Sequence, residues 1–164
     1  MAQAIVLGST VQCTDGKGGS ISHIVLDSTT HSLEYLVVHR GLFGGHNHCV
    51  AASAIRDASA DTVSLTISTA QLKALPELDV VLPDTAVHQR SIPERCAALK
   101  KGTPVTAADG KVVGHLRGVA IDSAHRVEHL LLDDRDQTRI PVAQLSVCTE
   151  EGLTVELVER AGAG

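Results

Sequence analysis

The stretch "GSTVQCTDGKGGSISHIVLDSTTHSLEYLVV" (residues 8–38) returns in altered form as "GTPVTAADGKVVGHLRGVAIDSAHRVEHLLL" (residues 102–132). Both copies contain an Asp-Gly-Lys step, a later Asp-Ser step, and a histidine just before a final apolar run. The similarity resumes downstream, where residues 50–55 match 140–145. Internal repeats of this kind predict two copies of one structural unit.

Within each copy the residue pattern is typical of strands. "SISHIVL" (residues 20–26) and its counterpart alternate polar and apolar residues and then become continuously apolar, which indicates strands with one buried face. The branched residues of "LEYLVV" and "VEHLLL" also favour strands. Asp-Gly at positions 15–16 and 109–110 supplies the positive φ of a hairpin turn. We therefore expect an all-β fold of two tandem, small antiparallel β-barrels with short connecting helices.

The repeat also divides the chain. It predicts a first barrel at residues 1–75, a linker at 76–99 and a second barrel at 100–160. Three of the five prolines fall in the linker. Because the linker also contains the apolar run "DVVLP", we expect it to pack on a barrel.

Several local signals can be assigned to caps and turns. Ser68 and Gln71 have the spacing of a capping box, so a short helix is expected there, and a second is expected where Ser91 and Glu94 repeat that spacing.

Asp27 and Asp122 can each open an Asx turn. The glycine-rich "GKGGS" is interpreted as a turn, because its counterpart "GKVVG" is not glycine-rich. His31 and His125 recur before equivalent strands and are interpreted as hairpin residues rather than as a paired site.

Composition excludes several classes of function. The chain has 164 residues, a net charge of −5 and scattered basic residues, and it has one Tyr, one Phe and no Trp. Nucleic-acid binding is not expected, because it needs clustered cations or stacking platforms.

No apolar run approaches the ~20 residues that cross a bilayer, and no basic segment precedes the first apolar run, so we expect a cytoplasmic protein without direct membrane insertion. The four cysteines form no C-x-x-C pair, and we expect buried thiols.

These elements together resemble the PRC-barrel family, which includes the cytoplasmic barrel of the photosynthetic reaction centre H subunit and the C-terminal barrel of the ribosome maturation factor. The first unit matches through "DGKGGSISHIVLD", "LEYLVVHRGLFGG" and "STAQLKALPEL", and the second through "DGKVVGHLRGVAID", "VEHLLL" and "RIPVAQL". The first unit has Val50-Ala51 where the second has the expected Ile140-Pro141 step. The resemblance implies a docking scaffold without catalytic residues to transfer.

The stretch "GLFGGHNHC" (residues 41–49) contains the most suggestive side chains. On a strand, His46 and His48 point to one face and Cys49 to the other. That arrangement offers two transition-metal ligands, but zinc sites normally need three or four, so His39 across the hairpin is the nearest candidate for a third. The alternative is a solvated hairpin arm with Cys49 in the core. The opposed faces also argue against a Cys–His catalytic pair.

Leu42 and Phe43 are the candidate partner-binding residues. They are large apolar residues among glycines that cannot cover them. Either they fold back over the barrel or pack within a homo-oligomer, or they anchor a partner.

The sequence therefore predicts a non-enzymatic adaptor that docks on other proteins, with a homo-oligomer as its expected state and membrane-associated complexes among its candidate partners. A metal-binding or metal-sensing protein that uses His46 and His48, and a ribosome-assembly factor, remain as alternatives.

Overall fold

The structure is a computed structural model, and it describes residues 3–41, 45–59, 61–77, 79–81, 88–90, 95–134 and 138–156. Across these residues the chain is all-β, as predicted. Ser91 and Glu94, where a second helix is expected, lie outside the described residues, and the residues that would continue that helix, Cys96–Lys100, form a strand instead. None of the described helices is long and apolar enough to span a membrane.

Two seven-stranded sheets form the body of the molecule. In spatial order the first sheet contains β5(His46–Ala51), β4(Leu33–Arg40), β3(Gly16–Asp27), β2(Thr10–Cys13), β7(Thr62–Leu65) and β6(Ile55–Ala58), with β10(Cys96–Lys100) beside β3. The second contains β14(Arg139–Pro141), β13(Val127–Leu132), β12(Val112–Ile121), β11(Pro104–Ala107), β16(Gly152–Val155) and β15(Leu145–Thr149), with β1(Gln3–Val6) beside β12. A separate hairpin pairs β8(Asp79–Val81) with β9(His88–Arg90).

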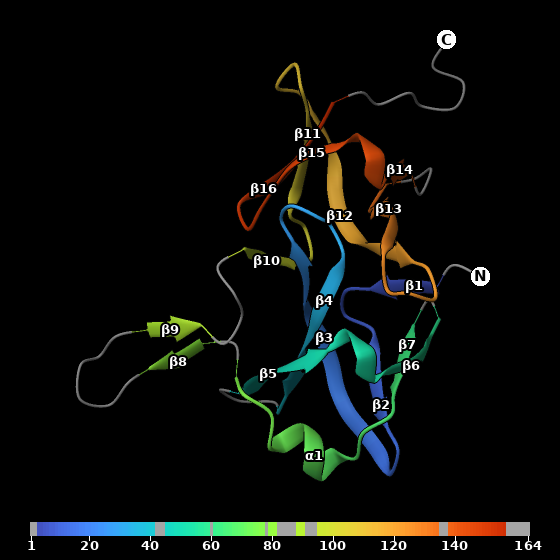
Figure 1. Cartoon of the computed structure of the whole chain (residues 1–164), viewed down its shortest axis with the longest axis vertical. Coiled ribbons are helices and arrows are strands. Elements are labelled where there is room, and N and C mark those ends of the chain that lie inside the picture. Colours follow the sequence, from blue (N-terminus) through green and yellow to red (C-terminus); the bar gives the residue numbers. More distant parts are fainter. Residues whose placement is uncertain are drawn as a thin grey trace.

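The two sheets have the same strand order, as the sequence repeat predicts. Short 3-10 turns also occupy equivalent places, η1(Ala52–Ala54) before β6 and η2(Val142–Gln144) before β15. We refer to β2–β7 as the first unit and to β11–β16 as the second unit. They lie one above the other along the long axis of the molecule (Figure 1).

Each unit pairs with a strand that lies next to the other unit in the sequence. β1 precedes the first unit but pairs with β12 of the second, in a register that sets Ile5 opposite Val119. β10 precedes the second unit but pairs with β3 of the first, and Leu99 lies opposite Ile24. Figure 1 shows dark-blue β1 beside the orange strands of the second unit, and yellow β10 beside the blue strands of the first. The exchange is reciprocal, so neither unit is complete without the other.

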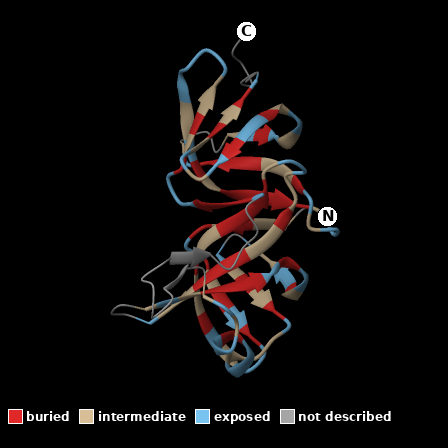
Figure 2. Cartoon of the chain, turned by 60° about the vertical axis from the view of Figure 1, so that its left-hand side comes forward, coloured by how far each residue is buried: buried red, intermediate tan, exposed pale blue. Residues whose placement is uncertain are grey.

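One apolar core extends through both units. Its buried side chains run from Ile5 on β1 to Val155 on β16, and they form a single cluster. Figure 2 shows these buried residues continuing across the middle of the molecule, while exposed residues lie mainly in the loops around its outside. Because aromatic residues are nearly absent, the core consists of aliphatic side chains, with cysteine at its margins.

Two features of the sheets differ from the expected antiparallel barrels. First, β2 pairs with β7, and β11 with β16, in parallel. The cause is that η1 and η2 replace a hairpin between β5 and β6 and between β14 and β15, so the chain turns a corner there instead of folding back on its neighbour. Second, strand pairing among the described residues closes neither sheet into a ring.

The equivalent β3–β4 and β12–β13 turns have the same design, and both Asx turns are confirmed. Asp27 Oδ1 accepts hydrogen bonds from the backbone N–H groups of Thr29 and Thr30, and Asp122 Oδ1 plays the same part in the second unit. His31 and His125 then adopt positive φ angles of 59° and 63°. The recurring histidines are hairpin residues, as the sequence predicts, and their positive φ is a conformation that is uncommon for residues other than glycine.

The Asp27 turn predicts a dependence of stability on acidic pH. Hydrogen bonds from Thr30 and Thr29, with a further bond from the Arg95 guanidinium, lower the pKa of Asp27 below its usual value. A carboxyl whose pKa is lower in the folded state stabilises the fold above its unfolded pKa of about 4, and that contribution is lost as pH falls through the folded pKa. We expect Asp27→Asn to weaken the acid-induced loss of stability between pH 5 and pH 2, measured by urea denaturation. Asp57→Asn, which alters an exposed carboxylate, is the control; an unchanged acid profile in Asp27→Asn would contradict this account.

The predicted capping box is confirmed in the helix α1(Thr69–Lys73). Ser68 Oγ accepts a hydrogen bond from the Gln71 N–H, and Gln71 Oε1 accepts one from the Ser68 N–H, at 3.2 and 2.8 Å. Asp15, in the β2–β3 turn, accepts two further bonds from the backbone and hydroxyl of Thr69. The helix is therefore fixed to the hairpin that carries the start of β3.

Candidate binding site at the β4–β5 end of the first unit

The candidate site lies where β4 and β5 approach their connecting loop. The two strands pair from Tyr35 opposite Ala51 to Arg40 opposite His46. The predicted partner-binding residues Leu42 and Phe43 lie in this loop, outside the described residues. The predicted histidines and the ends of both strands are described.

His46 and His48 lie near each other but have different surroundings. Their ring centroids are 6.2 Å apart. His46 is exposed, and its Nδ1 lies 2.8 Å from Glu77 Oε1. His48 is buried, and its Nδ1 is 2.9 Å from the carbonyl oxygen of Leu75. Because a carbonyl can only accept, Nδ1 carries the hydrogen and His48 secures the segment after α1 to β5.

The third proposed metal ligand does not join these two. His39 lies opposite Asn47 in the β4–β5 register, and its Nδ1 is 2.8 Å from Asn47 Oδ1. Residue 47 alternates with 46 and 48 along β5, so His39 shares the opposite face of the sheet. Within the described ranges, no three His, Cys, Asp or Glu side chains are placed to hold a metal ion.

Cys49 lies on the face opposite His48. It is buried in a small second cluster with Val25, Val37, Cys96 and Ala98. All four cysteines are buried, as predicted, and no disulfide joins them. Burial raises the pKa of the Cys96 thiol, and it raises that of Cys148 to about 11, so these two cysteines are in the poorly nucleophilic thiol form at neutral pH.

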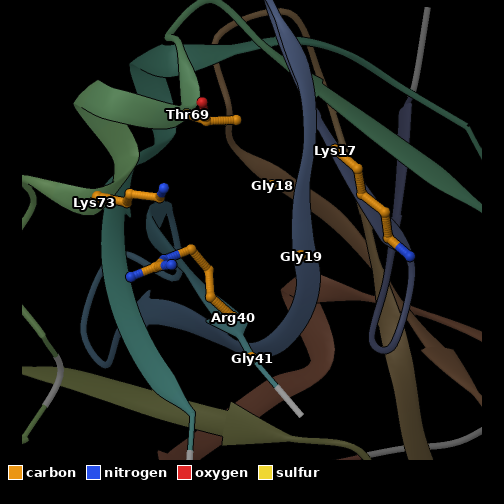
Figure 3. Close-up of a pocket in the computed structure, with 7 residues that line it drawn as sticks. All are labelled: Lys17, Gly18, Gly19, Arg40, Gly41, Thr69 and Lys73. Carbon is orange, nitrogen blue, oxygen red and sulfur yellow. The ribbon is translucent and has the colours of Figure 1, made fainter.

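A pocket of about 360 Å³ opens on the same end of the unit, between α1, the start of β3 and the end of β4. Its lining residues are cationic, small or hydroxylic: Lys17, Gly18, Gly19, Arg40, Gly41, Thr69 and Lys73. Figure 3 shows the side chains of Arg40 and Lys73 reaching into the same space, whereas Lys17 extends away from it. We call this feature the cationic pocket.

The glycines of the "GKGGS" segment help to shape this pocket, and the interpretation of that segment as a turn is wrong. Residues 16–20 are part of β3, and the turn is made by the preceding Thr14 and Asp15. A Cβ atom at Gly18 would lie 2.8 Å from Cys13 Sγ and 2.9 Å from a Leu72 methyl carbon. The missing side chain therefore lets α1 pack directly on the strand, which places Lys73 near the end of β4.

Among the described residues, the second unit differs from the first at the position of Arg40. By the sequence repeat, Asp134 takes the position of Arg40. Asp134 closes its own turn by accepting hydrogen bonds from the backbone and hydroxyl of Thr138, at 2.8 and 2.5 Å. The same order of strands therefore forms without a cation at the position of Arg40.

A second cavity, of about 530 Å³, lies between the two units near Asp27, Glu34 and Arg126. Its most buried carboxylate, Asp27, already accepts bonds from two backbone N–H groups and Arg95. The backbone of Leu33 also bonds across this junction to the His125 carbonyl oxygen. We attribute this cavity to the joint between the units.

A scan of protein-family models and a search of curated proteins found no match to this chain.

Proposed function

We propose that this chain is a non-enzymatic docking module of the cytoplasm, in which two PRC-barrel-like units form one scaffold and the β4–β5 end of the first unit binds a partner protein. The observation that carries the proposal is the difference between the equivalent ends of the two units. The second unit closes its β13–β14 turn through Asp134 and Thr138. The first unit has at this place the cationic pocket, beside a loop that contains Leu42 and Phe43.

The reciprocal strand exchange supports a scaffold function. A docking module gains affinity when its binding surface is held rigid before the partner arrives. β10 is hydrogen-bonded along β3 from Asp27 to His23, and β3 in turn carries β4, the strand that leads to the proposed docking end. The apolar core that spans both units therefore supports the binding end of the first.

The metal-binding alternative receives less support. His46 and His48 are close, but among the described residues no third His, Cys, Asp or Glu side chain joins them in a group that could hold a metal ion. His39 lies on the other face. We therefore do not advance this alternative as a second function.

The test removes the proposed apolar anchor. We expect Phe43→Ala to reduce recovery of the partner by about tenfold or more, because buried aromatic anchors supply a large share of interface energy. Affinity purification of the full chain from its native cells, quantified by mass spectrometry, measures the partner, and light scattering measures self-association. Val112→Ala, which truncates an exposed apolar residue of the second unit, is the matched control. Unchanged partner recovery and unchanged self-association in Phe43→Ala would refute the proposed docking end.

A further inference from the structure

We infer that the cationic pocket is a binding site for a compact oxyanion of the phosphate class, held by Arg40 and Lys73. The inference goes beyond the docking function and does not depend on it. It rests on the geometry of the pocket, the state of its cations and the contrast with the second unit.

Two positive charges converge here without a paired anion among the residues that the structure describes. Arg40 ends β4 and Lys73 ends α1, and both side chains reach into one space (Figure 3). Neither forms an ion pair with any residue that the structure describes. The Nε of Arg40 is buried and has no hydrogen-bond partner there. A buried donor without a partner is costly, and a bound anion would satisfy it while removing the repulsion between the two cations.

The carboxylate of Asp15, which lies near Lys73, is already held by hydrogen bonds. Asp15 lies close enough to Lys73 for the two to interact electrostatically. However, its two oxygens accept hydrogen bonds from the backbone N–H and the hydroxyl of Thr69, at 2.9 and 3.1 Å. Asp15 thus secures α1 to the β2–β3 turn, and its single negative charge offsets only one of the two positive charges of Arg40 and Lys73.

The walls of the pocket leave room for an anion. Gly18, Gly19 and Gly41 contribute no side chains to it, and the cavity measures about 360 Å³. This is near the lower end of the range for small-molecule sites. A phosphate group with a small ester substituent therefore fits in size.

The chemistry of the cations favours phosphate. The planar guanidinium of arginine binds two oxygens of one phosphate group, and the lysine ammonium adds a point charge. The guanidinium and the ammonium together can engage three or more oxygens, which a tetrahedral phosphate presents and a carboxylate, with two oxygens, does not. A nucleic-acid strand is disfavoured by the net charge of −5.

The second unit indicates that a cation at the position of Arg40 is not needed for folding. It builds the same order of strands with Asp134 where the first unit has Arg40. The charge of Arg40 therefore has to be explained by something other than the shared fold.

The experiment titrates the ¹⁵N-labelled full chain with inorganic phosphate at constant ionic strength, and follows backbone amide shifts. We expect saturable shifts at Gly18, Gly19 and Gly41. Arg40→Gln and Lys73→Gln should each weaken binding by about tenfold or more, because each removes a charge-assisted interaction. Lys111→Gln makes the same change of charge at an exposed position of the second unit and should bind as the unaltered chain does.

Parallel titrations identify the form of the ligand. Tighter binding of glycerol 3-phosphate than of inorganic phosphate assigns the site to a phosphate ester, and equal or weaker binding assigns it to the free anion. The proposal is overturned if phosphate causes no more change than chloride, if its shifts map away from the three glycines, or if all variants bind alike. The mapping on the unaltered chain decides the question even if a variant folds poorly, and no partner protein is needed.

Discussion

Leu99→Ala should lower the free energy of unfolding by about 2–5 kcal/mol, and its damage should fall on the first unit, although Leu99 lies next to the second in sequence. The Leu99 side chain is fully buried. Its strand, β10, pairs with β3 at Ile24. Truncating a buried leucine removes apolar contacts and leaves a cavity, which accounts for a cost of this size. Urea denaturation measures the loss, and amide hydrogen exchange shows where protection falls first.

The reciprocal variant, Ile5→Ala, makes the test specific. Ile5 is also fully buried and lies opposite Val119 on β12, so its loss should reduce protection first in β12 and β13. Val112→Ala, at a residue that is 57% exposed, should cost little. If Ile5→Ala weakens only the first unit and Leu99→Ala only the second, each unit retains its own first strand and the exchange is refuted.

The sequence predicts the local structure well because its signals act over short distances. Asp27 and Asp122 bond to backbone groups two to four residues away, and Ser68 and Gln71 satisfy each other within one helical turn. Each interaction is complete within a few residues, so the sequence alone predicts it. The repeat adds the prediction that both units share one order of strands.

The partners of the first strands could not be predicted in the same way. "QAIV" lies before the first copy of the repeat and "CAALK" before the second, and the sequence does not say which sheet each joins, because a residue pattern reports a buried face and not a neighbour. The sequence does not predict the parallel pairing of β2 with β7 either, because residues 10–12 lie 52 positions from residues 62–64, with which they pair. Both features depend on contacts between distant segments.

At the candidate site, too, the sequence predicts the local arrangement of side chains but not the contacts between distant segments. Alternation along β5 predicts that His46 and His48 share a face, and their ring separation of 6.2 Å is consistent with this. The position of His39 depends on the β4–β5 register, which places it opposite Asn47. Arg40 and Lys73 are brought together only by the packing of α1. The one sign of this pocket in the sequence was the reversal of charge between the two copies of the repeat, where Asp134 takes the position of Arg40.

Gly19→Ala should be the most damaging change at the cationic pocket, with an expected loss of about 2–5 kcal/mol. Gly19 has a φ angle of +145°, and a Cβ atom there would lie 2.1 Å from the carbonyl oxygen of His39. An unusual backbone angle costs about 1–3 kcal/mol, and forcing β3 away from β4 adds a packing cost of similar size. The variant should therefore also displace Arg40, the residue that follows His39.

Gly16→Ala separates the two costs. Gly16 has a similar φ of +157° but nothing within 4 Å of the position that a Cβ atom would take, so its variant should lose only the contribution of the backbone angle. Thermal and urea unfolding of both variants give the difference, and the amide signals of residues 38–41 report any displacement of β4. Equal destabilisation by the two substitutions would show that the approach of the His39 carbonyl to β3 is not a constraint, and the pocket would then not depend on a glycine at position 19.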